Sequence, residues 1–328
     1  MGKVSMLVLS IEDILGLGVS MADCVRLCEE TLRQEGLGNT AIAPSPPLHL
    51  GSEPPKLYLH GMPAYVGGLE AAGVKWVSHI TGNAAQGLPD SSGVIILNDP
   101  RTGMPQCILE GMWVTYQRTA ALTAVAAKYL ARPDAVSIGI VGAGALGRVA
   151  VLALREVLPG ITTVKAVSRR EASRRAYVEE MRKLVDYDII PVPSVREAVI
   201  DADVIVSSAT TFEAPLIRRA WLKPGALLAP LVGGSECEPA CLRQADKLLV
   251  QHWPTFAAQA PKRGVDIAGL SLYAELGDVV CGRKPGREAA GEIIVSINGG
   301  VGTTDMAIAQ RLCQTARERG IGRSVSLF

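Results

Sequence analysis

The sequence has few aromatic residues, no excess of charge of either sign and no long uncharged apolar run. Aromatic side chains make up 4% of the 328 residues, hydrophobic residues 48% and charged residues 20%, a composition that excludes a disordered chain. The 33 Lys and Arg residues against 32 Asp and Glu give a net charge of +1, so no overall field attracts nucleic acid or an anionic membrane. No apolar run approaches the roughly 18 residues of a membrane-spanning helix. We therefore expect a globular protein with neither nucleic-acid nor membrane partners.

Metal-binding and disulfide patterns are also missing. The 7 cysteines include no C-x-x-C pair, and the 4 histidines are scattered rather than spaced as zinc ligands. Cys24/Cys28 and Cys237/Cys241 have the spacing of core neighbours on one helix face. We therefore expect no metal site. Reduced thiols without a signal peptide favour a cytoplasmic protein.

Two kinds of sequence pattern divide the chain. In the first part, short β-like segments precede a strongly helical, Ala-rich segment at 115–131. From residue 136 on, short apolar strands alternate with helices, which is typical of parallel crossovers in a doubly wound sheet. The sequence therefore predicts an α/β protein: a Rossmann-type dinucleotide-binding domain over 132–302, and a smaller, discontinuous α+β domain for substrate binding and dimerisation, formed by 1–131 with 303–328.

A glycine-rich turn follows the first strand of the second pattern. Residues 142–147 read GAGALG, between the strand 136–141 and a helical run to about 158. Gly142 would make the tight turn, Gly144 would let a pyrophosphate approach the backbone, and Gly147 would allow close packing of helix and strand. Free N–H groups at the helix start, near Ala145 and Leu146, would face the phosphates. The turn predicts a dinucleotide site.

The end of the next strand predicts which dinucleotide binds. An NAD site usually has Asp or Glu there to accept a hydrogen bond from the ribose 2′-hydroxyl. This chain has Ser168, Arg169 and Arg170 instead. Two guanidiniums and a hydroxyl suit a 2′-phosphate, and two charge-assisted hydrogen bonds shift the preference by roughly 10²-fold or more. We therefore expect NADP(H) rather than NAD(H).

Several motifs outside the glycine turn resemble those of one family. They are MP (62–63), GVKWVSH (73–79), GVIILNDPRTG (93–103), QRTAA (117–121), ADKLLV (245–250), AELGDVVCG (274–282) and KPGRE (284–288). Through these motifs the chain resembles the ornithine cyclodeaminase/μ-crystallin family over nearly the whole length of the sequence. Within that family, it most resembles the dehydrogenases that form 2,3-diaminopropionate for siderophores. The resemblance implies a homodimer, a Rossmann domain, and hydride exchange between a nicotinamide and a carbon–nitrogen bond.

The resemblance also implies site residues. Lys75 matches the family's active-site lysine, whose ammonium would donate a proton or stabilise negative charge. Arg118 matches an arginine that would bind a substrate carboxylate or a cofactor phosphate. The further cofactor-binding residues would be Thr119, Ser208, Ala209 and Thr210, and the further substrate-binding residues Met62, His79, Ser235 and Asp305.

The sequence departs from the family pattern at four places. In cyclodeaminases a catalytic Asp follows a Gly-Gly pair, whereas Ser235 and then Glu236 follow it here, which favours plain reduction over cyclisation. The segment 44–48 reads PSPPL and lacks the family's basic residue for a substrate carboxylate. Two explanations are open: Lys56 or His60 replaces it, or the substrate has no α-carboxylate. The loop 298–305 is one residue shorter than usual, and the arginines at the ribose contradict the diaminopropionate pattern.

Three functions follow from these residues. The first is an NADP(H)-dependent oxidoreductase that reduces an imine or ketimine, with Lys75 supplying the proton to nitrogen. The second is oxidative cleavage of an N-substituted amino acid, as in 2,3-diaminopropionate synthesis, with amino-acid dehydrogenase or cyclodeaminase as related reactions. The third is a non-catalytic, crystallin-like protein that binds NADPH.

Overall fold

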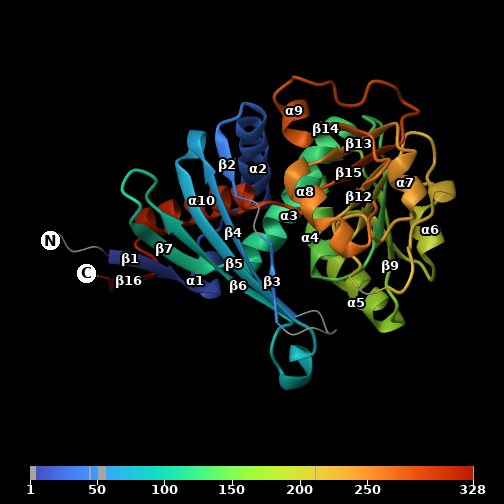
Figure 1. The fold of residues 1–328 in the computed structure, drawn as a ribbon. Helices are drawn as coiled ribbons and strands as arrows, with labels where there is room; N and C mark the ends of the chain where they lie inside the picture. Colours follow the sequence, from blue (N-terminus) through green and yellow to red (C-terminus); the bar gives the residue numbers. More distant parts are fainter. Residues whose placement is uncertain (1–4, 44–45, 51–56, 211, 328) are drawn as a thin grey trace. The chain divides into compact units, whose positions relative to one another are not determined.

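The computed structural model describes residues 5–43, 46–50, 57–210 and 212–327 (Figure 1). The chain forms two compact units, Met1–Arg118 with Val301–Phe328 and Thr119–Gly300. The boundary falls inside helix α3 (Met112–Leu130). Each unit is built around its own eight-stranded sheet. The expected α/β class, with a Rossmann-type sheet and a second sheet, is confirmed.

The sheet of the first unit is mixed. Its strands run in the order β16-β1-β7-β6-β5-β4-β2, with β3 also paired to β4. Among the described strands, β1 and β7 are the only parallel neighbours. The strands are β1 (Ser5–Leu9), β2 (Thr40–Ile42), β3 (Leu48–His49), β4 (Leu57–Val66), β5 (Ala71–Ile80), β6 (Ser91–Asn98), β7 (Pro105–Glu110) and β16 (Arg323–Ser326).

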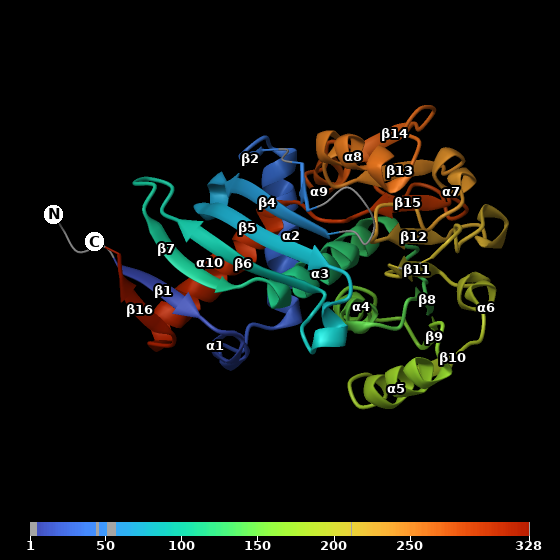
Figure 2. The same ribbon diagram turned by 60° about the horizontal axis from the view of Figure 1, so that its bottom comes forward.

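The helices of the first unit are α1 (Ile11–Gly16), α2 (Met21–Gly36), α10 (Gly302–Arg319) and the short 3₁₀ turns Gly67–Leu69 and Asn83–Gln86. Ser10 and Ser20 begin α1 and α2 with reciprocal capping boxes that use Asp13 and Asp23. Helix α10 lies across one face of strands β4–β6 (Figure 2). This face is therefore the inner face of the sheet.

The sheet of the second unit is entirely parallel, in the order β10-β9-β8-β11-β12-β15-β13-β14. From β8 the chain continues to β9 and β10 on one side of β8, and then crosses to β11 on its other side. The strand order therefore reverses between β8 and β11, and this position is a topological switch point. The strands are β8 (Ser137–Val141), β9 (Thr163–Val167), β10 (Asp188–Pro191), β11 (Val204–Ser207), β12 (Leu227–Pro230), β13 (Lys247–Val250), β14 (Leu272–Glu275) and β15 (Ile294–Ile297).

Short helices connect these strands. They are α4 (Ala145–Arg155), α5 (Glu171–Met181), α6 (Val195–Val199), α7 (Pro239–Arg243), α8 (Trp253–Gln259), α9 (Leu276–Val280) and the 3₁₀ turns Arg219–Trp221 and Pro261–Arg263. A core of branched aliphatic side chains, including Ile205, Leu228 and Val295, covers one face of the sheet. Cys237 and Cys241 belong to this core, and Cys24 and Cys28 are buried on α2 in the first unit. Both pairs are core residues as expected, but Cys237 precedes helix α7 and does not share a helix face with Cys241.

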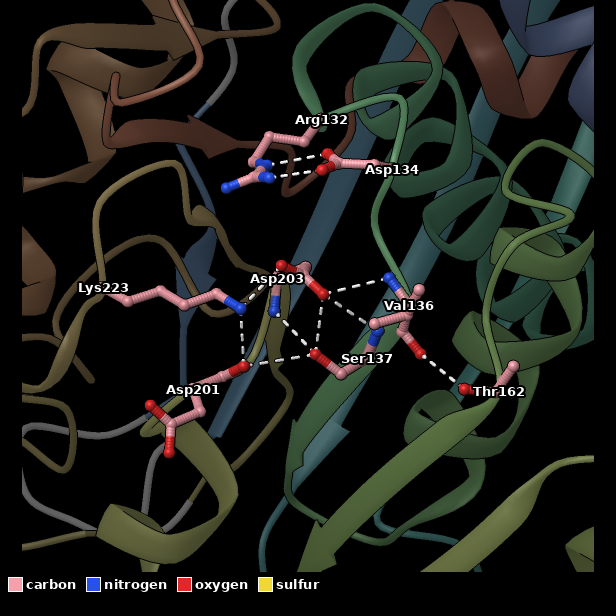
Figure 3. A network of polar contacts seen from close by, with 8 residues as sticks. All are labelled: Arg132, Asp134, Val136, Ser137, Thr162, Asp201, Asp203 and Lys223. Atoms are coloured by element: carbon pink, nitrogen blue, oxygen red, sulfur yellow. Dashed lines mark hydrogen bonds and ion pairs between the residues drawn. The ribbon is translucent and has the colours of Figure 1, made fainter.

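A polar clamp holds the amino ends of β8 and β11 together (Figure 3). The Asp203 carboxylate accepts hydrogen bonds from the Val136 and Ser137 amides at 3.0 and 3.1 Å and from Ser137 Oγ at 2.8 Å. Lys223 Nζ pairs with the same carboxylate at 2.7 Å. Burial alone would raise the pKa of Asp203, but the bonds from Lys223, Val136 and Ser137 outweigh it and lower that pKa. The clamp lies at the sheet edge opposite the glycine turn.

The described helices include none with the length and hydropathy that a membrane span requires.

Candidate active site

Three charged side chains meet inside the first unit. Lys75 Nζ donates to Asp305 Oδ2 at 2.7 Å, and Arg118 Nε donates to Asp305 Oδ1 at 3.1 Å. The exposed fractions of the three residues are only 1% for Lys75, 4% for Arg118 and 0% for Asp305. Buried charges are tolerated only when paired, and here one carboxylate serves two cations.

The register of the sheet and one close helix contact bring these groups together. Lys75 stands on β5 with Met62 of β4 and Ile95 of β6 directly beside it. At the start of α10, a Cβ on Gly302 would lie 2.7 Å from the Met62 carbonyl oxygen and 2.9 Å from the Ala64 Cβ. Only glycine allows so close an approach, and it places Asp305, three residues later, over Lys75.

The environment of Lys75 prepares it for proton transfer. Burial, and then the positive charge of Arg118, lower its pKa from 10.5 to about 8, although Asp305 acts in the opposite direction. A group with a pKa near neutral pH is suited to general acid–base work. Thr115, one helical turn before Arg118 on α3, places its Oγ1 3.5 Å from Lys75 Nζ. Thr115 was not predicted as a site residue from the sequence, although its i,i+3 spacing to Arg118 was an available signal.

His79 and Met62 occupy different places relative to Lys75. Met62 is its direct strand neighbour, whereas His79 stands four residues further along β5, roughly 13 Å away at the usual rise per residue. The His79 ring stacks on Tyr58, with 5.7 Å between ring centroids, and its Nδ1 lies 2.8 Å from Ser91 Oγ. His60 is opposite Val77, between these two positions. Lys56 lies outside the described residues.

In the second unit, the glycine turn has the predicted geometry. Gly142 has φ = +107°, and a Cβ there would lie 2.8 Å from the Ala209 amide nitrogen and 2.9 Å from Ser208 Oγ. A Cβ on Gly147 would lie 2.4 Å from the Gly142 carbonyl oxygen. Around Gly144, by contrast, a Cβ would meet nothing within 4 Å. The turn is closed where the backbone must pack and open where a phosphate would approach.

The helix that follows offers its amino end. Helix α4 begins at Ala145 and continues through Leu146 and Gly147, and its N-cap Gly144 has no side chain to satisfy the first N–H groups. Such N–H groups bind anions. Ser208 Oγ donates to the Gly142 carbonyl at 2.9 Å, and Ala209 and Thr210 follow it beyond the end of β11. The residues present therefore fit the pyrophosphate of a dinucleotide.

The Ser168–Arg170 segment lies directly after β9, the neighbour of β8. Arg169 and Arg170 are exposed, and in the described part of the chain neither guanidinium has a hydrogen bond or ion pair. Arg174 and Arg175 of α5 are engaged instead: Arg174 donates to the Ser168 carbonyl at 2.5 Å, and Arg175 pairs with Glu171 at 2.6 Å. Two guanidiniums thus remain available where a cofactor ribose is bound in Rossmann folds.

The position that carries a catalytic Asp in cyclodeaminases has no outward carboxylate. Ser235 is half-buried, and the Glu236 side chain turns back into its own loop, where it accepts from the Val232 amide at 3.0 Å and the Gly234 amide at 2.9 Å. Burial raises the pKa of Glu236, and the amide bonds offset this only in part. Glu236 therefore holds the loop and does not replace the missing Asp.

Thr119, the first residue of the second unit, is buried at 4% exposure next to Arg118 on α3. Among the residues that the structure describes, no three His, Cys, Asp or Glu side chains gather into a potential metal site.

The sequence matches a known family. The model of the ornithine cyclodeaminase/mu-crystallin family covers residues 5–320. A Staphylococcus aureus protein named N-((2S)-2-amino-2-carboxyethyl)-L-glutamate dehydrogenase is 29% identical over 277 residues, which are 81% of either chain.

Two solved structures resemble the whole fold. The Delta(1)-pyrroline-2-carboxylate reductase of Thermococcus litoralis, in complex with NADH and L-proline, is 30% identical with a TM-score of 0.87, and the match covers 98% of this chain and 100% of that one. An archaeal alanine dehydrogenase dimer with bound NAD is 28% identical with a TM-score of 0.88, covering 99% and 100%. Both of these structures hold a nicotinamide dinucleotide.

Proposed function

The chain belongs to the ornithine cyclodeaminase/mu-crystallin family, and from this premise we propose that it is an NADP(H)-dependent oxidoreductase that reduces an imine or ketimine to an amine. The broader statement, an enzyme that acts on CH–NH groups, is supported by relatives named as a pyrroline-2-carboxylate reductase and an alanine dehydrogenase. The family resemblance inferred from the motifs is thereby confirmed.

The observation that carries the proposal is the buried Lys75–Asp305–Arg118 cluster. When bound, the reduced nicotinamide supplies a hydride to the C=N carbon. Lys75 Nζ, with a pKa of about 8, gives the proton that the nitrogen then needs, so the double bond gains one hydride and one proton. Asp305 fixes the ammonium at 2.7 Å. Arg118, which the family resemblance assigns to the substrate carboxylate or a cofactor phosphate, has the planar guanidinium that suits such an anion.

The choice of NADP(H) is supported by Arg169 and Arg170. Both solved relatives hold the cofactor without a 2′-phosphate, so the proposal makes this chain differ from them at the ribose. In the proposed complex the two guanidiniums and the Ser168 hydroxyl bind the 2′-phosphate. The glycine turn and the carboxyl end of β11, with Ser208, Ala209 and Thr210, hold the pyrophosphate. Arg118 and Thr119 of α3 are assigned to the cofactor because the family resemblance implies this role for them.

We further propose that the protein forms a homodimer through the outer face of the first sheet. On the face opposite Lys75, Tyr65, Trp76 and Val94 stand on adjacent strands β4, β5 and β6, with exposed fractions of 39%, 45% and 38%. Exposed apolar surface shared by neighbouring strands usually marks an interface. The archaeal relative of nearly identical fold is a dimer.

A second function is favoured by one relative. The Staphylococcus aureus dehydrogenase is named for an N-substituted glutamate, so oxidative cleavage of such a compound is the alternative reaction. It would consume the oxidised cofactor and one water and release 2-oxoglutarate and an amine, whereas imine reduction consumes NADPH. Ser235 would contact the substrate in either direction.

Turnover with a set of cyclic and acyclic imines tests the proposal, followed as loss of NADPH fluorescence. In Lys75→Met we expect turnover to fall by roughly 10²–10⁴-fold, with unchanged NADPH affinity. Lys247→Met is the matched control, because Lys247 is also buried and pairs with Glu288 at 2.6 Å; it should retain turnover. Wild-type protein that binds NADPH but oxidises it with no imine would refute the reductase proposal and favour a binding protein.

A further inference from the structure

Asn298, just beyond β15, is a buried polar side chain whose hydrogen bonding is incomplete. Its exposed fraction is 0%, and its Nδ2 donates to Ser296 Oγ at 3.0 Å. Its Oδ1 is buried and has no hydrogen-bond partner among the described residues. Turning the amide over would leave Nδ2 unpaired instead, so one strong polar atom lacks a partner in either orientation. Such a group in a folded protein calls for a ligand or an ordered water.

The position of Asn298 in the sheet suggests which ligand it meets. It lies at the carboxyl edge of the parallel sheet, where the glycine turn also lies, and β15 follows β8, β11 and β12 in the strand order. Three strand spacings, about 14 Å, separate it from β8. In doubly wound sheets the dinucleotide crosses this edge at the switch point. With the adenosine ribose on the β9 side, the other half of the cofactor extends over β11 and β12 toward β15.

We infer that Asn298 binds the carboxamide of the nicotinamide ring. A primary carboxamide carries both N–H donors and a carbonyl acceptor, so it can satisfy Asn298 whichever atom of that side chain is unpaired. This contact would fix the rotation of the ring and thereby the face that it presents. The inference rests on the proposed dinucleotide site and adds a residue that reads the nicotinamide half.

Ser207 provides a matched control. Its Oγ is the other buried hydroxyl or amide oxygen without a partner at this edge of the described sheet, and its exposed fraction is 0%. On β12, the residue paired with Ser207 is Pro230. The pairing of β12 with β15 ends at Leu228 and Val295, so the next residues in register are Ala229 and Ser296. Successive residues of a strand point to opposite faces, and the bond to Ser296 puts Asn298 on the Ser296 side. Ser207 therefore lies on the other face.

Calorimetry with three ligands tests the inference without measuring activity. The ligands are NADP⁺, its pyridine analogue with hydrogen in place of the carboxamide, and 2′-phospho-ADP-ribose, which lacks the ring. We expect Asn298→Leu to reduce the preference for NADP⁺ over the analogue by roughly five- to tenfold relative to wild type. Binding of 2′-phospho-ADP-ribose should stay the same, and Ser207→Ala should keep the full preference. Asn298→Ser, which keeps a hydroxyl near Ser296, should show the same loss and guards against misfolding of the leucine variant.

Two results would overturn the inference, and they are distinguishable. An unchanged preference in both Asn298 variants, with 2′-phospho-ADP-ribose still bound, would mean that Asn298 meets only water, and the proposed function would stand. Wild-type protein that binds none of the three ligands would remove the dinucleotide site itself, and with it both proposals.

Discussion

Replacing Asp305 by asparagine tests the charge cluster most directly. The substitution keeps the shape of the side chain but removes the negative charge that lies 2.7 Å from Lys75 Nζ and 3.1 Å from Arg118 Nε. Burial and Arg118 already lower the pKa of Lys75 to about 8, and Asp305 is the group that opposes them. Without it, we expect that pKa to fall by a further roughly 1–3 units, the usual effect of one opposite charge at this distance.

Two measurements follow from this shift. The proposed proton donor is the ammonium, so kcat/KM for imine reduction falls as pH rises through the Lys75 pKa. The falling limb should therefore lie near pH 8 in the wild type and roughly 1–3 units lower in Asp305→Asn. Removing one partner of a buried pair costs about 3–5 kcal/mol. With an unfolding entropy of roughly 2.1 cal/mol/K per residue over 328 residues, this lowers Tm by roughly 4–7 °C.

The pH dependence of stability has a definite sign. In the folded variant the pKa of Lys75 lies below 10.5, which is its ordinary value in the unfolded chain. Between the lowered pKa and 10.5 the unfolded chain binds more protons, so stability rises with pH in this window. Below the window both states are protonated and the full cost of the unpaired ammonium is present.

Asp203→Asn is the control, because Asp203 is also a buried carboxylate paired with a lysine at 2.7 Å, in the clamp at the opposite edge of the second sheet. This variant should have a lower free energy of unfolding, but the decrease of kcat/KM with pH should still occur near pH 8. If the limb stays near pH 8 in Asp305→Asn as well, Lys75 is not the group that titrates, and the proton-donor role is wrong.

Two further predictions concern the cofactor and the dimer. Replacing Arg169 and Arg170 by Asp and Ser should weaken NADPH binding by roughly 10²-fold or more and leave NADH binding within a few-fold in calorimetry; equal loss of both cofactors would show that the pair does not select the 2′-phosphate. Trp76→Glu places a charge on the exposed face formed with Tyr65 and Val94; sedimentation should show monomers at concentrations where the wild type is dimeric, and an unchanged dimer would exclude this face as the interface.

Much of the fold follows from local sequence patterns. The glycine turn and the strands around it were predictable because each depends on neighbouring residues: Gly142 needs its positive φ, and short apolar segments alternate with helices. Strand β4 is less evident, because only residues 57–60 have a clear β-like pattern whereas the strand continues to Val66. Gly61 and Pro63 weaken its strand pattern, yet pairing with β5 continues past both of them.

The site itself depends on contacts that no local pattern contains. Lys75 and Asp305 are 230 residues apart in the chain, and their separate motifs did not reveal that one carboxylate serves both Lys75 and Arg118. The orientation of the Glu236 side chain could not be predicted either. It follows two glycines with positive φ, Gly233 and Gly234, and a residue after such a pair can point in several directions. Only the folded loop shows that its own amides hold the carboxylate.

The late position of helix α10 has a consequence for biosynthesis. The ribosome adds roughly 5–20 residues per second, so the 230 residues between Lys75 and Asp305 take about 10–50 s to appear. During that interval the nascent first sheet lacks α10 over its inner face and the carboxylate that pairs with its lysine, while the second unit, Thr119–Gly300, is still being synthesised. The newborn chain therefore exposes apolar strands for tens of seconds, which is the period in which a chaperone would be of most use to it.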